Sequence, residues 1–113
     1  MTNEKIVKIL KQKYNLPVFY RKVFEKDLKN YNYFIYGETN LRKDACRYYQ
    51  TIEVVWVTER GYNPGLQEID IIETLESIGL RLAENATYDE VQISKTNQYL
   101  DIVTFHFSRP VKK

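Results

Sequence analysis

The chain is poor in the residues that build metal sites, disulfides and phosphate-binding loops. Its 113 residues include one cysteine, one histidine, four glycines and three prolines. A single cysteine excludes an internal disulfide, and one cysteine with one histidine cannot form a zinc site of the usual kind. The sequence contains no P-loop, dinucleotide-binding or nucleophile-elbow motif. These absences remove the most common nucleotide-dependent, zinc-dependent and hydrolytic functions.

Long apolar stretches are also missing. No run of about 18 apolar residues occurs, so no membrane-spanning segment is predicted. The opening MTNEKIVKILKQK spreads acids and lysines through its length, so we expect no signal peptide there. The lone cysteine favours a reducing cytoplasm. The length and the 43% hydrophobic content predict one domain over residues 1–113 with a core of its own.

The residues that could perform catalysis are isolated from one another. His106 falls on the strand face opposite Phe105 and Phe107, which favours a structural or solvent-facing histidine. Cys46 has no CxxC partner and is interpreted as a small packing residue. Asp89 and Glu90 are adjacent, but acid–base catalysis requires two acids in different environments around a pocket. We therefore expect no enzyme, no cofactor and no bound metal.

The net charge of +2 conceals a division along the chain. Residues 1–30 hold eight Lys/Arg against three Asp/Glu, whereas residues 31–90 hold five against eleven. Residues 91–113 are basic again, with four Lys/Arg against one Asp. Basic and acidic regions can attract each other within one subunit or between subunits, or can be two solvated faces of opposite sign.

Hydrophobic periodicity predicts an α+β domain in the order α-β-β-β-α-β-β. Helical spacing indicates helices over residues 3–14 and 64–78, the second with an apolar stripe that includes Ile69 and with Gly79 as its C-terminal cap. The predicted sheet is mostly antiparallel, has four to five strands, and uses residues 18–24, 33–36, 47–58, 80–88 and 100–108. Gly37 is expected to end the second strand, and the tail RPVKK is expected to be loose.

Nucleic-acid binding is the sharpest alternative from the residues themselves. Ten tyrosines and 17 basic residues could stack bases and bind phosphate, and the candidate patch is Tyr14, Tyr20, Arg21 and Lys22. Against this, the tyrosines are scattered over every element, the middle of the chain is acidic, and the aromatic–glycine motif of RNA-recognition domains is missing. Tyrosines that serve strands and an assembly interface fit the pattern better.

A family resemblance is carried by the order of several segments. LPVFYRK follows a short helix, YFIYGE ends a strand in Gly-Glu, and TNLRKDACRYY leads into TIEVVWVTE. An amphipathic helix ending at Gly79 and the strand LDIVTFHFS complete the layout. From Leu16 to Ser108 this layout resembles the small tail completion proteins, also called tail terminators, of long-tailed phages and prophages of Gram-positive bacteria.

The resemblance implies a structural protein of the virion, assembled in the host cytoplasm and located at the head–tail junction. Such proteins form a homo-hexameric ring, with subunits that can be monomeric when free. The ring caps the head-proximal end of the tail tube, stops its polymerisation and gives the head connector a docking surface. The implied partners are further copies of the chain, the major tail tube protein and a head completion or connector protein, with no membrane and no required nucleic-acid contact. Another neck protein of the same particle remains an alternative.

Two surfaces are predicted to make these contacts. A ring requires a heterologous interface between unlike patches, and we expect a basic lysine row to meet an acidic helix, within or between subunits. The row is Lys5, Lys8 and Lys11, and the acids are Glu68, Asp70, Glu73 and Glu76.

The polar stretch before the longest strand is the expected docking loop, because it looks too long for a tight hairpin turn and carries Leu41 among charges. It comprises Thr39, Asn40, Leu41, Arg42, Lys43 and Asp44. A disordered surface loop, or a loop that becomes ordered on assembly, is the alternative interpretation.

Overall fold

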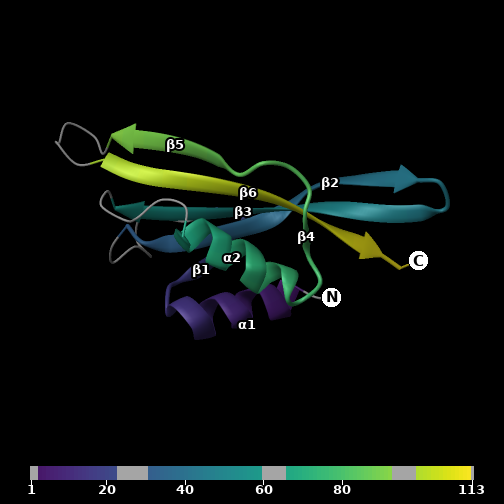
Figure 1. Cartoon of the computed structure of the whole chain (residues 1–113), viewed down its shortest axis with the longest axis horizontal. Helices are drawn as coiled ribbons and strands as arrows, with labels where there is room; N and C mark the ends of the chain where they lie inside the picture. Colours follow the sequence, from purple (N-terminus) through teal and green to yellow (C-terminus); the bar gives the residue numbers. More distant parts are fainter. Residues whose placement is uncertain (1–2, 23–30, 60–65, 93–98, 113) are drawn as a thin grey trace.

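The computed structural model describes residues 3–22, 31–59, 66–92 and 99–112. This part of the chain forms an α+β fold, as the sequence predicted, with two helices on one face of a mostly antiparallel, six-stranded sheet (Figure 1). The elements are α1 (Asn3–Tyr14), β1 (Val18–Tyr20), β2 (Tyr33–Asp44), β3 (Arg47–Glu59), α2 (Leu66–Glu76), β4 (Arg81–Leu82), β5 (Thr87–Gln92) and β6 (Tyr99–Val111).

The sheet is built around two long strands, β3 and β6. The order is β1-β2-β3-β6, and both β4 and β5 pair with the outer edge of β6. Only β1 and β2 run parallel, while the other pairs are antiparallel. The predicted strand over residues 80–88 is therefore wrong in detail. It is two strands, because residues 83–86 leave the ladder between the pairs Leu82↔Phe107 and Thr87↔Thr104.

The core lies between the helices and the sheet. Alternate side chains of β2, β3 and β6 point to the helices, so that Phe34, Trp56 and Val103 form one cross-strand row. α1 contributes Ile6 and Leu10, which are fully buried. Burial of each such side chain stabilises the fold by roughly 1.5–3 kcal/mol.

The apolar stripe predicted for residues 64–78 packs on the sheet, except at Ile69. Leu75 is fully buried, and half-buried Ile72 and Ile78 pack against the core. Ile71 is also buried, whereas Ile69, predicted to lie in the stripe, is 54% exposed. Glu68, predicted on the polar side, is 3% exposed and accepts a hydrogen bond from the Tyr88 hydroxyl at 3.2 Å. Isoleucines on two sides of this helix make its apolar direction ambiguous from the sequence.

Both helices end as their sequences predict. Asn15 has a positive φ of 54°, and its N–H donates to the Lys11 carbonyl at 2.9 Å. Gly79 has a φ of 105°, and the N–H of Leu80 donates to the carbonyl of Leu75. That bond, together with the one from the Gly79 N–H to the Glu76 carbonyl, is the Schellman arrangement, in which glycine tolerates the left-handed conformation.

A smaller apolar cluster lies on the face of the sheet away from the helices. Tyr33, Val57 and Leu100 are buried there, and half-buried Ile35 and Val55 pack against them. We call this face, which points away from the helices, the open face. It is apolar at the end of the sheet that includes β1 and β5. His106 lies on this face, opposite Phe105 and Phe107, as predicted, and pairs with Glu53 of β3.

Candidate functional site

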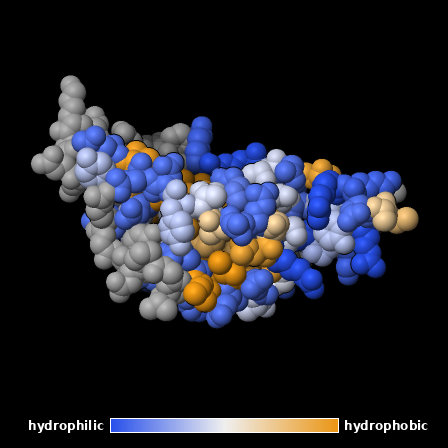
Figure 2. Space-filling view, turned by 45° about the horizontal axis from the view of Figure 1, so that its top comes forward, coloured by the Kyte–Doolittle hydropathy of each residue, from blue (hydrophilic) through white to orange (hydrophobic). Residues whose placement is uncertain are grey.

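The most distinctive feature of the structure is a three-stranded arm. It consists of Thr39–Asp44 of β2, Arg47–Thr51 of β3 and Ser108–Val111 of β6, which stay paired far beyond the helices (Figure 1). The whole molecule measures 51 × 28 × 25 Å. In Figure 2, which keeps the horizontal direction of Figure 1, the arm end is covered mostly by hydrophilic residues.

The arm overturns two predictions about conformation. Residues 39–44 were expected to be a loop, but they form the second half of β2, with Asp44 paired directly to Arg47. The tail RPVKK was expected to be loose, yet Arg109, Pro110 and Val111 continue β6. Because this segment pairs with β3, β2 continues as a strand beyond Gly37 despite its polar sequence. The predicted docking role of residues 39–44 stays a prediction, now attached to a strand.

A two-residue turn closes the arm. Ala45 has a positive φ of 56°, a region in which Gly, Asn or Asp is the common choice at hairpin turns. Cys46, interpreted from the sequence as a packing residue, is instead exposed at this tip. That interpretation is wrong because the turn lies outside the core.

The arm is basic and aromatic. The Arg42 guanidinium lies 5.4 Å from the Tyr49 ring centre, and the Lys43 ammonium lies 5.6 Å from that of Tyr48. An exposed cation–aromatic pair of this kind stabilises by about 0.5–1 kcal/mol. The pairs hold both cations against the arm, where they remain available to carboxylates or phosphates of a partner.

A polar network fixes the arm to the body of the protein. Glu38, at a bulge in β2, accepts hydrogen bonds from the Asn3 amide at 2.7 Å and the Tyr20 hydroxyl at 2.5 Å. The Arg21 guanidinium donates to the same carboxylate at 3.2 Å, and Arg109 lies 3.8 Å from it. Arg109 also donates to Gln50 at 2.6 and 3.1 Å and to Asn3 at 2.9 Å. The network thus connects α1, β1, β2, β3 and β6 at the base of the arm.

The network stabilises the ionised form of Glu38. The hydrogen bonds from Asn3 and Tyr20 lower its pKa from 4.5 to about 2. The side chains of Glu38 and Arg109 are only 16% and 12% exposed, so water screens this pair less than it screens surface ion pairs. A well-satisfied carboxylate of low pKa is a structural anchor and is poorly suited to accept a proton from a substrate.

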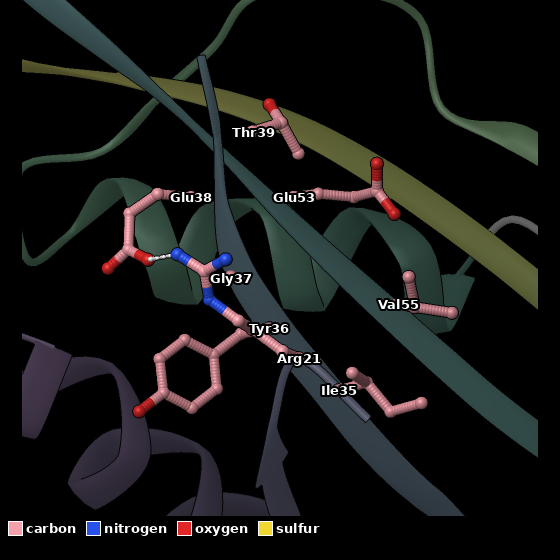
Figure 3. Close-up of a pocket in the computed structure, with 8 residues that line it drawn as sticks. All are labelled: Arg21, Ile35, Tyr36, Gly37, Glu38, Thr39, Glu53 and Val55. Carbon is pink, nitrogen blue, oxygen red and sulfur yellow. Dashed lines mark hydrogen bonds and ion pairs between the residues drawn. The ribbon is translucent and has the colours of Figure 1, made fainter. Parts of the chain in front are cut away.

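A shallow hollow lies beside this anchor on the open face of the sheet. Figure 3 shows the Arg21 side chain crossing Gly37, with its guanidinium directed to Glu38. A Cβ on Gly37 would meet the Cγ of Arg21 at 3.1 Å. The hollow, of about 200 Å³, is smaller than the roughly 300–1,000 Å³ of ligand pockets. Glycine here lets Arg21 lie close to the strand.

The expected lysine-to-acid contact between helices forms at the predicted acid Asp70, but with Lys13 and not with the predicted lysine row. Lys13 forms an ion pair with Asp70 at 3.0 Å, and the Tyr14 hydroxyl donates to Asp70 at 2.6 Å. These two bonds lower the pKa of Asp70. Lys5, Lys8 and Lys11 are exposed on α1, as are Glu73 and Glu76 on α2. Glu68 is buried, so the structure removes it from the predicted exposed surface.

The predicted nucleic-acid patch does not form one free surface. Tyr14 lies between the helices on Asp70, while Tyr20 and Arg21 bind Glu38. Within the described ranges, no group of three or more His, Cys, Asp or Glu residues could hold a metal ion. No helix among the described residues is long and apolar enough to cross a membrane.

Comparison with known proteins assigns no family. No family model and no curated protein matches the chain. One solved structure aligns with all of this chain and 97% of its own, at 12% identity and a TM-score of 0.47, and its name specifies no activity. Similarity at that level supports no conclusion about function.

Proposed function

We propose that this chain is a structural protein of the head–tail junction of a long-tailed phage or prophage. It caps the head-proximal end of the tail tube, stops tube polymerisation and provides the docking surface for the head connector. The observation that carries the proposal is the anchored arm, a rigid, charged projection with the properties of a protein-binding surface. The choice of this particular assembly rests on the order of segments in the sequence, which resembles that of tail terminators.

The arm suits assembly because it is ordered before it binds. A flexible loop loses conformational entropy when it docks, whereas a paired hairpin has already lost it. The network around Glu38 and Arg109 joins the three strands at the base of the arm to α1 and β1. The orientation of the arm is therefore a property of the free subunit, which favours a defined geometry in a ring and on a tube end.

A second candidate function follows from the composition of the arm. Arg42, Lys43 and Arg47 lie beside Tyr48 and Tyr49, a combination that single-stranded nucleic acid can use through stacking and phosphate contacts. Binding of this kind weakens steeply with salt, because neutralised phosphates release counterions. Salt-sensitive binding to a labelled oligonucleotide would favour a nucleic-acid-binding regulatory domain over a terminator.

Quantitative mass spectrometry of purified particles tests the proposed function. We expect the chain in every particle at about six copies, cross-linked by a lysine-reactive reagent to the tube protein and to a connector protein. Particles that lack the chain while it is present in the lysate would contradict the proposal. Cross-links to head components alone would instead indicate that the chain is another neck protein and not the tail terminator.

A further inference from the structure

Among the strand edges that have no strand neighbour in the described part of the chain, two are six residues long. One is the arm edge, Thr39–Asp44 of β2, which lies beyond the three residues of β2 that β1 covers. The other is the outer edge of β5, Thr87–Gln92, whose residues are all exposed. A strand edge without a strand neighbour is a template for a further strand. The two edges have equal length and lie on opposite sides of the sheet.

The edges also carry opposite charge. The arm edge holds Arg42 and Lys43, and the β5 edge holds Asp89 and Glu90. Each edge exposes apolar surface as well, with Leu41 and Tyr88 both 59% exposed. We propose that the arm edge of one copy adds as a strand to the β5 edge of the next copy, which makes one sheet continuous across subunits. This inference rests on the proposed function, because it specifies how the ring is joined.

Strand direction and side-chain parity fix how the edges meet. Within one sheet β2 and β5 run in opposite directions, so a continuous sheet joins them antiparallel. Arg42 lies on the open face, because it pairs with Tyr49, and Asp89 shares that face through its partner Ile102. Pairing Asp44 with Thr87 matches all six residues and sets Arg42 directly opposite Asp89. In that register Lys43 lies diagonal to Glu90, within reach of a long side chain.

The pairing is heterologous, as a ring requires. Two different edges meet, so each copy offers one of each and the chain of contacts can close. The edges lie at opposite ends of the sheet, about eight residues or about 27 Å apart along β6. Successive copies are therefore displaced along the strands as well as across them, and the strands are inclined to the ring axis. The Asp89 carboxylate, which accepts a hydrogen bond from the Glu90 N–H at 2.8 Å in the single copy, turns to Arg42 on pairing.

Charge exchange tests the pairing. One variant carries Arg42→Glu and Lys43→Glu, and the second carries Asp89→Lys and Glu90→Lys. In sedimentation velocity at low salt, each variant alone should self-associate at least tenfold more weakly than the wild type. An equimolar mixture should recover assembly, because only unlike copies then present complementary edges. The charge controls are Arg81→Glu and Glu84→Lys, single charge reversals at exposed positions outside both edges, and each should assemble normally.

Covalent capture tests the register. In a Cys46→Ser background, copies with Arg42→Cys and Asp89→Cys should form a ladder of disulfide-linked oligomers on mild oxidation. Arg42→Cys with Glu73→Cys should not, since Glu73 lies on α2. Assembly that survives both charge variants would overturn the edge pairing and leave the proposed function intact. A wild type that stays monomeric at all concentrations would also overturn it, because complementary edges on one chain need no third component.

Discussion

Glu38 gives the sharpest test of how the arm is held. The carboxylate is 16% exposed and joins α1, β1 and β6 through Asn3, Tyr20, Arg21 and Arg109. Replacing it by glutamine keeps the size and one acceptor oxygen but removes the charge. The side-chain amide then points N–H groups at partners that are themselves donors.

The magnitude follows from the pKa. A pKa of about 2 in the folded state, against the ordinary glutamate value of 4.5, corresponds to about 3 kcal/mol in favour of the folded state. Because the folded pKa is the lower one, this stability is fully present above pH 4.5. It is lost as the pH falls through 4.5 towards 2. Glu38→Gln should therefore cost about 2–3 kcal/mol at pH 7 and flatten the acid-induced loss of stability in that window.

Urea unfolding followed by tryptophan fluorescence measures both effects. Trp56 is 6% exposed in the core and reports on the folded state. Unfolding free energies at pH 7, 4 and 3 should separate the wild type from Glu38→Gln at pH 7 and bring them closer together at pH 3. Glu84→Gln, at an exposed position, is the matched control. A Glu38→Gln protein with wild-type stability at pH 7 and an unchanged pH slope would refute the reasoning.

Two further predictions address the turn and the second helix. Ala45→Gly should raise the unfolding free energy by about 0.5–1 kcal/mol, because glycine accepts the positive φ of 56° without strain. Thermal unfolding checks this, and a lower melting temperature would count against the turn geometry. Leu75→Ala should cost about 2–5 kcal/mol because the side chain is fully buried, whereas Ile69→Ala, at a residue 54% exposed, should cost far less. Equal losses of unfolding free energy in urea would contradict the exposed position of Ile69.

Elements with one buried face and one exposed face were predictable from the sequence. The first helix spans residues 3–14 as predicted, and the last strand has Phe105 and Phe107 on one side and His106 on the other. In each case one face of the element is buried, so hydrophobic residues recur with the period of the helix or strand. The fold class and the order of the main elements follow from those periods.

The arm could not be predicted from periodicity because neither of its faces is buried in the core. Residues 39–44 are all exposed, so selection for burial leaves no alternation of polarity. Ala45 and Cys46 also lack the residue types that usually announce a two-residue turn. The usable signal was the strand preference of Tyr48, Tyr49 and Thr51. It predicted the strand that begins at residue 47, but not that the preceding strand would continue alongside it through residues 39–44.

The anchor of the arm was missed for another reason. Asn3 and Arg109 are 106 residues apart in the chain, and Glu38 meets them only once the sheet is assembled. No local pattern encodes such a contact. The charge division was visible from the sequence, but its pairing was not. Asp70 binds Lys13 and Tyr14, neither of which belongs to the predicted lysine row.

Tail length in particles made without this chain tests the central claim most directly. Electron micrographs of particles from a phage with the gene deleted should show overlong, headless tails beside filled heads. Expression of the chain from a plasmid should restore tails of uniform length with heads attached. Normal infectious particles from the deletion strain would contradict the assembly account, and headless tails of normal length would contradict the termination role.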